Sequence, residues 1–329
     1  MIFQERRYDV FSLFLLKLII FLYFRRAKTK IFKYMKKKLL VVINPISGTG
    51  KQKGIEKILV NRLDSNMYDV EITHTEYAGH ASEIAREAVK KNFNNLVVVG
   101  GDGTVNEVVK ELIDTDITVG IIPCGSGNGL ARHLGIPMNT KKAISSINTF
   151  VHKKIDTISI NNEKCVNVAG IGFDALISYE FANMSKRGIV SYFKSVVKNY
   201  FSYKNQQFSI QNNGETKELK AFLFSIANSS QYGNNAYIAP DARIDDGLVD
   251  LVALKKPNLF QLPLLAISLF NKTIHKSSLC KVIEGSEFII NQVNDIAHID
   301  GEPLKLGRTI NVKVNPSSLN ILVNQNKKI

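Results

Sequence analysis

Cysteine is scarce in this sequence, and no two cysteines are close together. The chain of 329 residues has three, Cys124, Cys165 and Cys280, and none forms a CxxC pair. This spacing argues against a disulfide framework and against a zinc site, and it favours a reducing compartment such as the cytoplasm. Internal repeats and low-complexity segments are also missing. What remains is an ordinary globular composition, and the length predicts two domains.

Positive charge is sparse outside the amino-terminal segment. The net charge is +14, but residues 1–38 hold 11 of the 43 Lys/Arg and 2 of the 29 Asp/Glu, so the rest of the chain carries only +5. A nucleic-acid-binding protein is expected to spread a basic face over its folded domains. The pattern therefore argues against nucleic acid as a partner and favours a negatively charged membrane surface.

A long apolar run is missing as well. Residues 10–24 form a run of 15 residues that Lys17 interrupts, whereas a membrane span needs about 20. No small-residue cleavage site follows, which argues against a secretory signal. Three interpretations of the leader at 1–34 stay open: a mis-called start before Met35, a peripheral membrane anchor with basic flanks, or a true span.

Strand and helix patterns alternate from residue 38 to about residue 155. Continuous apolar runs are typical of strands buried on both faces, and apolar residues at helical spacing are typical of helices. The alternation predicts parallel strands joined by crossover helices. The predicted strands are 39–43, 69–76, 95–101 and 117–123, and the predicted helices are 54–63, 80–91 and 104–113.

Strand patterns dominate after residue 155. Turn signals at 212–214 and 245–247 separate them, and helical stretches interrupt at 188–201 and at about 257–275. This half predicts an antiparallel β-sandwich. A site made by both halves is then expected in the cleft between them.

Glycines and an acid follow the most apolar predicted strand, in "VVVGGDGTVNEVV" at 97–109. Ligands of parallel sheets bind beyond the carboxyl ends of the strands. A helix amino terminus there offers free N–H groups, and glycines let an anion approach the backbone. The segment therefore predicts a phosphate-binding loop. An acid beside a phosphate indicates a bridging Mg²⁺ at Asp102. The alternative is a plain turn in which Asp102 caps a helix.

Two more glycine-rich segments, "NPISGTGK" at 44–51 and "PCGSGNGLAR" at 123–132, follow other predicted strands. Parallel strands bring all three loops to the same rim of the sheet. Pro45 and Gln52 exclude a Walker loop, and Asn106 excludes a dinucleotide fingerprint. The sequence predicts a different kind of nucleotide loop.

Six motifs follow one another along the chain: "NPISG" (44–48), "GGDGTVNEV" (100–108), "PCGSGNGLAR" (123–132), "GIGFDA" (170–175), "PDARIDDGLVDL" (240–251) and "IDGEP" (299–303). In this order they resemble the catalytic domain of the diacylglycerol kinase family, which includes bacterial lipid kinases and sphingosine kinases. The resemblance covers residues 38–325. It implies a phosphofructokinase-like ATP-binding α/β domain at 38–160, a β-rich lipid-substrate domain at 161–329, and a site between them. It also implies cytoplasmic transfer of the γ-phosphate of ATP to a lipid hydroxyl at the membrane surface.

The resemblance implies roles for individual residues. Glu302 matches a general base that accepts the proton of the attacking hydroxyl. Asp102 is the alternative base, because the matching aspartate has that role in sphingosine-type members. A structural Mg²⁺ is implied at Asp246 with backbone carbonyls of Arg243 and Leu248, and a simple hairpin turn is the alternative. The implied ATP-binding residues are Asn44, Pro45, Thr75, Gly101, Asp102, Gly103, Thr104, Val105, Asn106, Glu107 and Ser126.

Several alternatives stay open. The favoured acceptor is a diacylglycerol-like lipid, with a sphingoid base or ceramide as the next choice. A soluble acceptor, as in the NAD kinases, is a further alternative, and intact Asp102 and Glu302 argue against an inactive lipid-binding relative. Asp174 either contacts the lipid headgroup or caps the following helix. The histidines have no metal-binding spacing and are interpreted as structural or solvated. A homodimer is left open.

Overall fold

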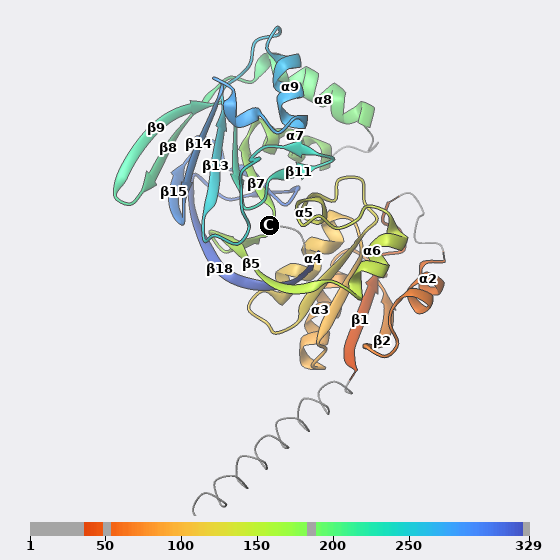
Figure 1. Ribbon diagram of the computed structural model, residues 1–329. Coiled ribbons are helices and arrows are strands. Elements are labelled where there is room, and N and C mark those ends of the chain that lie inside the picture. The colour runs from red at the N-terminus through yellow and green to blue at the C-terminus, as the bar shows by residue number, and fades with distance from the viewer. Residues whose placement is uncertain (1–35, 49–53, 183–188, 325–329) are drawn as a thin grey trace, which may run out of the picture.

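The computed structural model describes residues 36–48, 54–182 and 189–324. Figure 1 shows an α/β region that holds the first strands and a β-rich region beside it. The interpretations of the leader at 1–34 lie outside the described residues.

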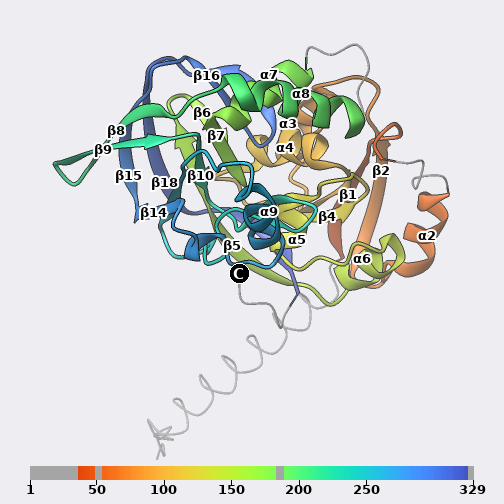
Figure 2. The same cartoon turned by 90° about the horizontal axis from the view of Figure 1, so that it is seen from above.

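The α/β region contains the predicted parallel sheet, in the order β2-β1-β3-β4. Every residue of β3 and β4 is buried, as their uninterrupted apolar sequences predict. Figure 2 shows α3 and α4 on one face of this sheet, and α2 and α6 on the other. The elements are β1 (Lys37–Ile43), α2 (Ile55–Arg62), β2 (Tyr68–His74), α3 (His80–Lys90), β3 (Asn95–Gly100), α4 (Asp102–Leu112), β4 (Thr118–Pro123), α5 (Gly129–His133) and α6 (Thr140–Ile147).

The β-rich region is the predicted sandwich. An antiparallel sheet of order β14-β13-β10-β7-β16-β17 packs on the continuation of the first sheet, β18-β15-β8-β9. Phe208 and Phe224 stack between the two layers with ring centroids 5.1 Å apart. The strands are β5 (Val151–Ile160), β6 (Glu163–Cys165), β7 (Val168–Gly172), β8 (Gln206–Asn212), β9 (Glu215–Ala221), β10 (Leu223–Ala227), β11 (Gln231–Gly233), β12 (Ala236–Tyr237), β13 (Val249–Leu254), β14 (Cys280–Gly285), β15 (Glu287–Asn291), β16 (Ile296–Ile299), β17 (Glu302–Lys305) and β18 (Thr309–Val323).

One long strand belongs to both regions. The first half of β18 contributes Ile310, Val312 and Val314 to the sandwich core. Its second half contributes 319 and 321–323 to the core of the α/β region, where Ile321 pairs with Val119 of β4. The prediction that the two domains divide at residue 160 is not tested. With that division, β18 follows the boundary in the sequence but packs in both regions.

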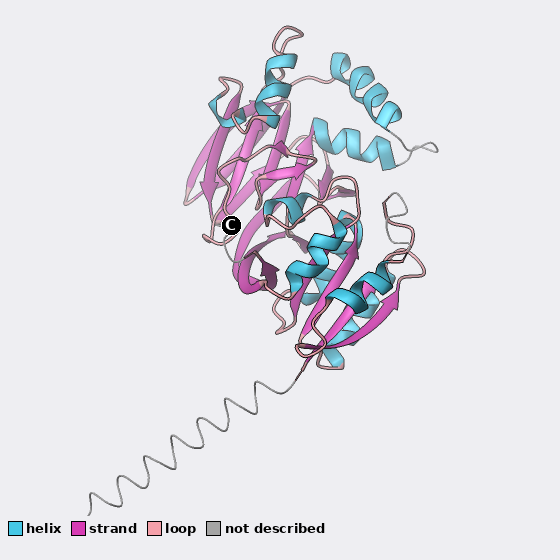
Figure 3. Ribbon diagram, turned by 45° about the vertical axis from the view of Figure 1, so that its right-hand side comes forward, coloured by secondary structure: helices cyan, strands magenta, loops and turns pink. Residues whose placement is uncertain are grey.

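Three helices cover the end of the sandwich (Figures 1 and 3). They are α7 (Phe173–Ala182), α8 (Ile189–Ser202) and α9 (Leu262–Phe270), and a 3-10 turn, η1 (Ile274–Lys276), follows α9. The helix predicted at about 257–275 is therefore shorter than expected. Within the described parts of the chain, no helix has the length and apolar character needed to span a bilayer.

Candidate functional site

The predicted glycine-rich loops meet at one rim of the parallel sheet, tied together by backbone hydrogen bonds. The amide of Asn44 donates to the carbonyl of Val99 at 3.0 Å, which joins the ends of β1 and β3. The amide of Cys124 donates to the carbonyl of Gly100 at 2.8 Å, which joins the ends of β3 and β4. These contacts place the three loops side by side, as parallel strands require.

Two of the glycines are needed for close packing, Gly125 between two loops and Gly100 within its own loop. A Cβ added to Gly125 would lie 2.7 Å from the Cα of Gly101, and one added to Gly100 would lie 2.7 Å from the Cβ of Thr104. Gly103 differs, because a Cβ there would meet no atom within 4 Å and the residue is exposed in the first turn of α4. The open side of the loop is therefore at Gly103.

Asp102 is held by a neighbouring loop. Its Oδ2 accepts the backbone N–H of Asn128 and its Oδ1 accepts that of Gly129, both at 2.7 Å. Asn128 is the residue that precedes α5, so the carboxylate caps the start of that helix. The alternative interpretation predicts that Asp102 caps a helix, and the structure shows that it does. The capped helix is α5, which follows β4, and not α4, in which Asp102 itself lies. Neither the base role nor the Mg²⁺ role of Asp102 is tested by this geometry.

Asn44 and Thr104 meet at the mouth of the loops. The Nδ2 of Asn44 donates to the Oγ1 of Thr104 at 2.8 Å, and its Oδ1 accepts the amide of Ile46 at 3.1 Å. Thr75 is buried, and its amide donates to the carbonyl of Ile43 at 2.9 Å. Pro45 and Ser126 are exposed on the same rim.

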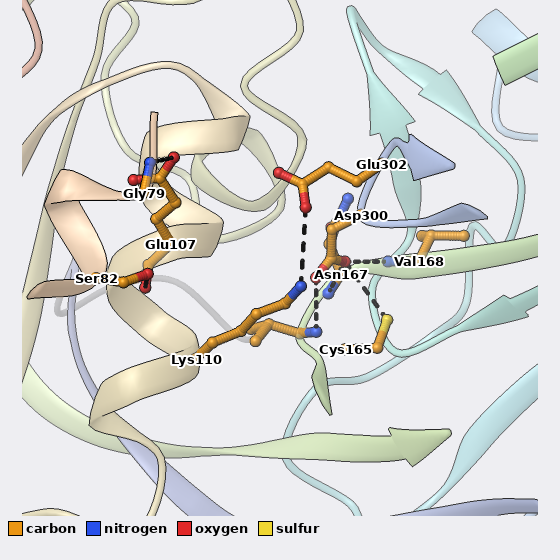
Figure 4. A network of polar contacts seen from close by, with 10 residues as sticks. Gly79, Ser82, Glu107, Lys110, Cys165, Asn167, Val168, Asp300 and Glu302 are labelled. Carbon is orange, nitrogen blue, oxygen red and sulfur yellow. Dashed lines mark hydrogen bonds and ion pairs between the residues drawn. The ribbon is translucent and has the colours of Figure 1, made fainter. Parts of the chain in front are cut away.

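Two other predicted nucleotide-binding residues face inward. Glu107 accepts the amides of Gly79 at 3.0 Å and Ala81 at 3.2 Å, so its carboxylate caps the start of α3 (Figure 4). Val105 is buried, and its amide donates to the carbonyl of Gly101 at 3.0 Å. Both residues position the rim, and direct contact with a nucleotide stays a prediction.

Sequence reasoning missed the residue that joins the two regions, Asp300. Its Oδ1 accepts the amides of Asn167 at 2.9 Å and Val168 at 3.1 Å, and its Oδ2 accepts that of Val166 at 3.2 Å (Figure 4). Burial raises the pKa of this carboxyl, although the N–H donors oppose the shift. Burial, followed by the nearby Asp300 charge, also raises the pKa of the Cys165 thiol.

Helix α4 reaches this carboxylate from the α/β region. With its amide nitrogen facing Asp300, Asn106 donates to Oδ2 at 2.9 Å, and its oxygen accepts from the Nζ of Lys110 at 3.1 Å. The four-residue spacing of Asn106 and Lys110, on one helix face, is the sequence signal that points to a shared contact.

Glu302 projects from the same hairpin as Asp300. The turn between β16 and β17 has positive φ at Asp300 (51°) and Gly301 (87°), a conformation for which a glycine is well suited. The Glu302 side chain is 54% exposed, and its Oε2 lies 4.0 Å from the Nζ of Lys110. The candidate base therefore faces α4 from the β-rich region.

The predicted metal residues lie on an acidic turn. Asp246 Oδ1 accepts the amide of Leu248 at 3.0 Å, and Arg243 pairs with Asp245 at 3.1 Å. Burial first, and then the carboxylates of Glu284, Asp246 and Asp241, raise the pKa of Asp250 to about 7. Across the described ranges, no group of three or more His, Cys, Asp or Glu side chains is placed to hold a metal ion. One carboxylate with backbone carbonyls, in acidic surroundings, still fits a hard cation.

Asp174 in "GIGFDA" joins a polar cluster at the start of α7. Its Oδ1 accepts the amide of Ala175 at 2.9 Å, and its Oδ2 lies 3.2 Å from His298 Nε2 and 3.3 Å from the Tyr232 hydroxyl. A Cβ on Gly170 would lie 2.1 Å from Asp174 Oδ2, so the glycine makes room for the cluster. His298 is thus a structural partner of an acid, in line with the interpretation of the histidines.

Comparison with known proteins gives consistent findings. Residues 38–160 match the family model of the diacylglycerol kinase catalytic domain, and residues 167–323 match that of the YegS C-terminal NAD kinase beta sandwich-like domain. The diacylglycerol kinase of Bacillus subtilis (strain 168) is 31% identical over 228 residues, covering 68% of this chain and 75% of that protein. The diacylglycerol kinase of Staphylococcus aureus (strain bovine RF122 / ET3-1) is 28% identical over 275 residues, covering 82% and 87%.

The solved structures agree on the fold. A crystal structure of a diacylglycerol kinase from Bacillus anthracis strain Sterne aligns with a TM-score of 0.69 at 21% identity, covering 88% of this chain and 97% of that one. A second structure from that organism gives a TM-score of 0.71 at 23% identity, covering 88% and 97%. The order of an α/β region followed by a β-sandwich is therefore shared.

Proposed function

This chain belongs to the diacylglycerol kinase family and is a phosphotransferase, and we propose that it transfers the γ-phosphate of ATP to a lipid hydroxyl, with a diacylglycerol-like acceptor. One observation carries the proposal. Helix α4 begins in the phosphate loop at Asp102, and Asn106 and Lys110 on the same helix contact the hairpin that bears Glu302. Asp102 and Asn106 are separated by about 6 Å along the helix axis. A short helical segment thus links the glycine-rich loops of the α/β region to the hairpin of the β-rich region that bears Glu302.

The nucleotide binds with its phosphates at the amino end of α4. The free N–H groups and the helix dipole attract the anion there, and the exposed Gly103 leaves the backbone open. Asn44, which contacts Thr104 at 2.8 Å, lies beside this opening and suits contacts to the ribose or adenine. Because hydrogen bonds already fix the loops against one another, little ordering is needed on binding.

Glu302 acts as the general base. The acceptor hydroxyl oxygen forms a bond to the γ-phosphorus, the bond between that phosphorus and the bridging oxygen of ADP breaks, and Glu302 takes the hydroxyl proton. Its carboxylate is exposed, and Lys110 at 4.0 Å offsets its charge. Asp102 is the alternative base, and each of its oxygens accepts one amide hydrogen bond at 2.7 Å, which leaves a second lone pair on each oxygen for a proton or a cation.

Mg²⁺ is the proposed cofactor. When bound, the ion neutralises charge on the phosphates of the nucleotide. Asp102 would hold a magnesium ion beside the phosphates, and Asp246, with the carbonyls of Arg243 and Leu248, would hold a structural one. Only the carboxylate-and-carbonyl chemistry of these residues supports the two assignments.

The test is transfer from radiolabelled ATP to a total lipid extract, with the labelled product identified by chromatography. Glu302→Gln should abolish transfer and leave ATP binding nearly intact. Glu287→Gln, an exposed glutamate on β15 that pairs with Lys313 at 2.7 Å, is the matched control and should transfer at the parent rate. Turnover that survives in Glu302→Gln would remove that residue from the base role.

A soluble acceptor is the second candidate. The match of residues 167–323 to an NAD kinase beta sandwich-like domain supports this second candidate. NAD added to the same assay separates the two, since label in NADP and none in lipid would replace the lipid-kinase proposal. Labelled sphingoid base or ceramide, in place of phosphatidic acid, would correct the acceptor only.

A further inference from the structure

Helix α9 lacks a polar face. Its sequence is LPLLAISLF, and its one polar side chain, Ser268, donates internally to the carbonyl of Leu265 at 2.7 Å. A helix on the surface of a globular protein normally presents charged or polar residues to water. The composition of α9 therefore requires a partner on both of its sides.

Among the residues that the structure describes, a partner lies on one side of α9 only. Leu265 and Leu269 pack on the core cluster that contains Val252, and Leu262 packs on the aromatic cluster that contains Phe222. On the other side, Leu264, Ile267 and Phe270 follow one another at three-residue spacing. They are 68%, 55% and 57% exposed, respectively.

The loop before α9 extends the exposed surface. Leu259 and Phe260 are 57% and 91% exposed. The loop is braced by two hydrogen bonds of 2.9 Å, from the amide of Asn258 to the Gln261 side chain and from the amide of Gln261 to the Asn258 side chain. The exposure of Phe260 is thus built into a fixed turn.

Helix α8 lies at the same end of the molecule as α9, remote from the parallel sheet (Figure 1), and Leu262 of α9 packs against the cluster that contains Tyr200 of α8. Lys256 ties the segment before α9 to the end of α8, since its Nζ donates to the carbonyl of Tyr203 at 2.7 Å and lies 4.8 Å from the centre of the Tyr200 ring. We call the combined surface the apical patch. Its apolar members are Val197, Phe201, Leu259, Phe260, Leu264, Ile267 and Phe270.

The charges on the sequence segment that carries α9 and the loop before it have one sign. Residues 251–283 contain five lysines and no aspartate or glutamate. An apolar centre with lysines at its edge matches an anionic bilayer, where apolar side chains enter the acyl boundary and lysines meet the headgroups. A second copy of the chain fits less well, because a symmetric contact would bring the same lysines together.

We propose that the apical patch docks this chain on an anionic membrane, with Phe260 and the outer face of α9 entering the bilayer. Docking would bring the enzyme to a lipid acceptor, and this biological role rests on the proposed function. The docking itself rests only on the surface described above. It does not depend on residues 1–34.

The absence of tryptophan from the whole chain allows a positional test. Phe260→Trp, in the otherwise unchanged full chain, gives one fluorophore in the patch. Val60→Trp gives a matched one on α2, where Val60 is 71% exposed. On vesicles of phosphatidylglycerol and phosphatidylcholine, emission at 260 should move to shorter wavelength, and emission at 60 should stay unchanged. Pure phosphatidylcholine vesicles should produce a smaller shift at 260.

A second measurement covers the case in which tryptophan perturbs the turn. Phe260→Ser with Leu264→Ser should weaken sedimentation with anionic vesicles by about tenfold or more, since two large apolar side chains no longer enter the bilayer. Val60→Ser with Val89→Ser is the control, because both valines are exposed on helices of the α/β region, α2 and α3.

Three outcomes would overturn the proposal: no shift at 260, an equal shift at 60, or a shift at 260 that grows with protein concentration without vesicles. The last would assign the patch to a second copy of the chain. Both measurements omit ATP, so a protein that docks without transferring phosphate would contradict only the proposed function, and one that transfers without docking would contradict only the patch.

Discussion

Replacing Gly103 by alanine separates phosphate binding from folding. The residue lies in the first turn of α4, outside the left-handed region, and the added Cβ would meet no atom within 4 Å. Alanine is favoured over glycine in a helix by about 0.5–1 kcal/mol. We expect the variant to be more stable than the parent by up to that amount, which corresponds to about 1–3 °C in the unfolding temperature.

The same methyl group should block the nucleotide. It stands at the open side of the loop, where the phosphate has to reach the N–H groups of α4. We expect ATP affinity to fall at least about tenfold, which corresponds to about 1.4 kcal/mol. Calorimetric titration with ATP and Mg²⁺ measures the affinity, and thermal unfolding measures the stability.

Gly125→Ala is the informative control. Its Cβ would lie 2.7 Å from the Cα of Gly101, so that variant should lose stability and ATP binding together. If Gly103→Ala bound ATP as well as the parent, the amino end of α4 would not be the phosphate site. If instead it unfolded, the space beside Gly103 would not be open.

Three further substitutions and one control variant test other parts of the site. Asp102→Asn should cost about 1.5–3 kcal/mol in urea unfolding, because one charge-assisted bond to the 128–129 backbone is lost. Stability equal to that of the parent would contradict the capping role. Asp300→Asn should cost about 1–3 kcal/mol. Because the folded-state pKa of Asp300 is raised above 3.8, the parent's advantage over this variant should be full below about pH 4 and shrink as the pH rises through the folded-state pKa. An advantage that grew with pH in unfolding at pH 4–7 would contradict the burial argument. Mg²⁺ should raise the unfolding temperature of the parent and of Asp245→Asn, but not of Asp246→Asn, and equal responses would remove the metal from this turn.

Local patterns were enough to predict β3, α4 and β4, because each carries its own apolar period. They were not enough for β9, which was not predicted. Its sequence, ETKELKA, is polar because it is the edge strand of the first sheet, paired with β8 alone, and polar edges protect sheets from further pairing. The end of α9 was also not predicted. The helix is apolar all round, so its sequence pattern does not mark where it stops, and the chain leaves the helix just before Lys272, which has a φ of 60°.

The meeting of the three loops could be predicted, because the ends of parallel strands share a rim. The partners of the charged side chains could not be. Asp102 binds backbone amides 26 and 27 residues further along the chain, and Asp300 binds amides more than 130 residues earlier. No periodicity encodes such pairs, which depend on how the loops fold against one another.

Asp156 shows how the two regions are locked together. It is buried, and its two carboxylate oxygens accept the amides of Ser317 at 2.6 Å and Gly247 at 2.7 Å. Ser317, with a φ of 52°, lies where the pairing of β5 and β18 shifts register. One acid thus ties the irregular point of the shared strand to the turn that carries Asp246. A motion between the two regions would have to bend the paired strands β5 and β18. It would also strain the contact between α4 and Asp300. These contacts hold the loop at the start of α4 and the hairpin that bears Glu302 in one arrangement, and cation binding at the Asp246 turn should stabilise that arrangement.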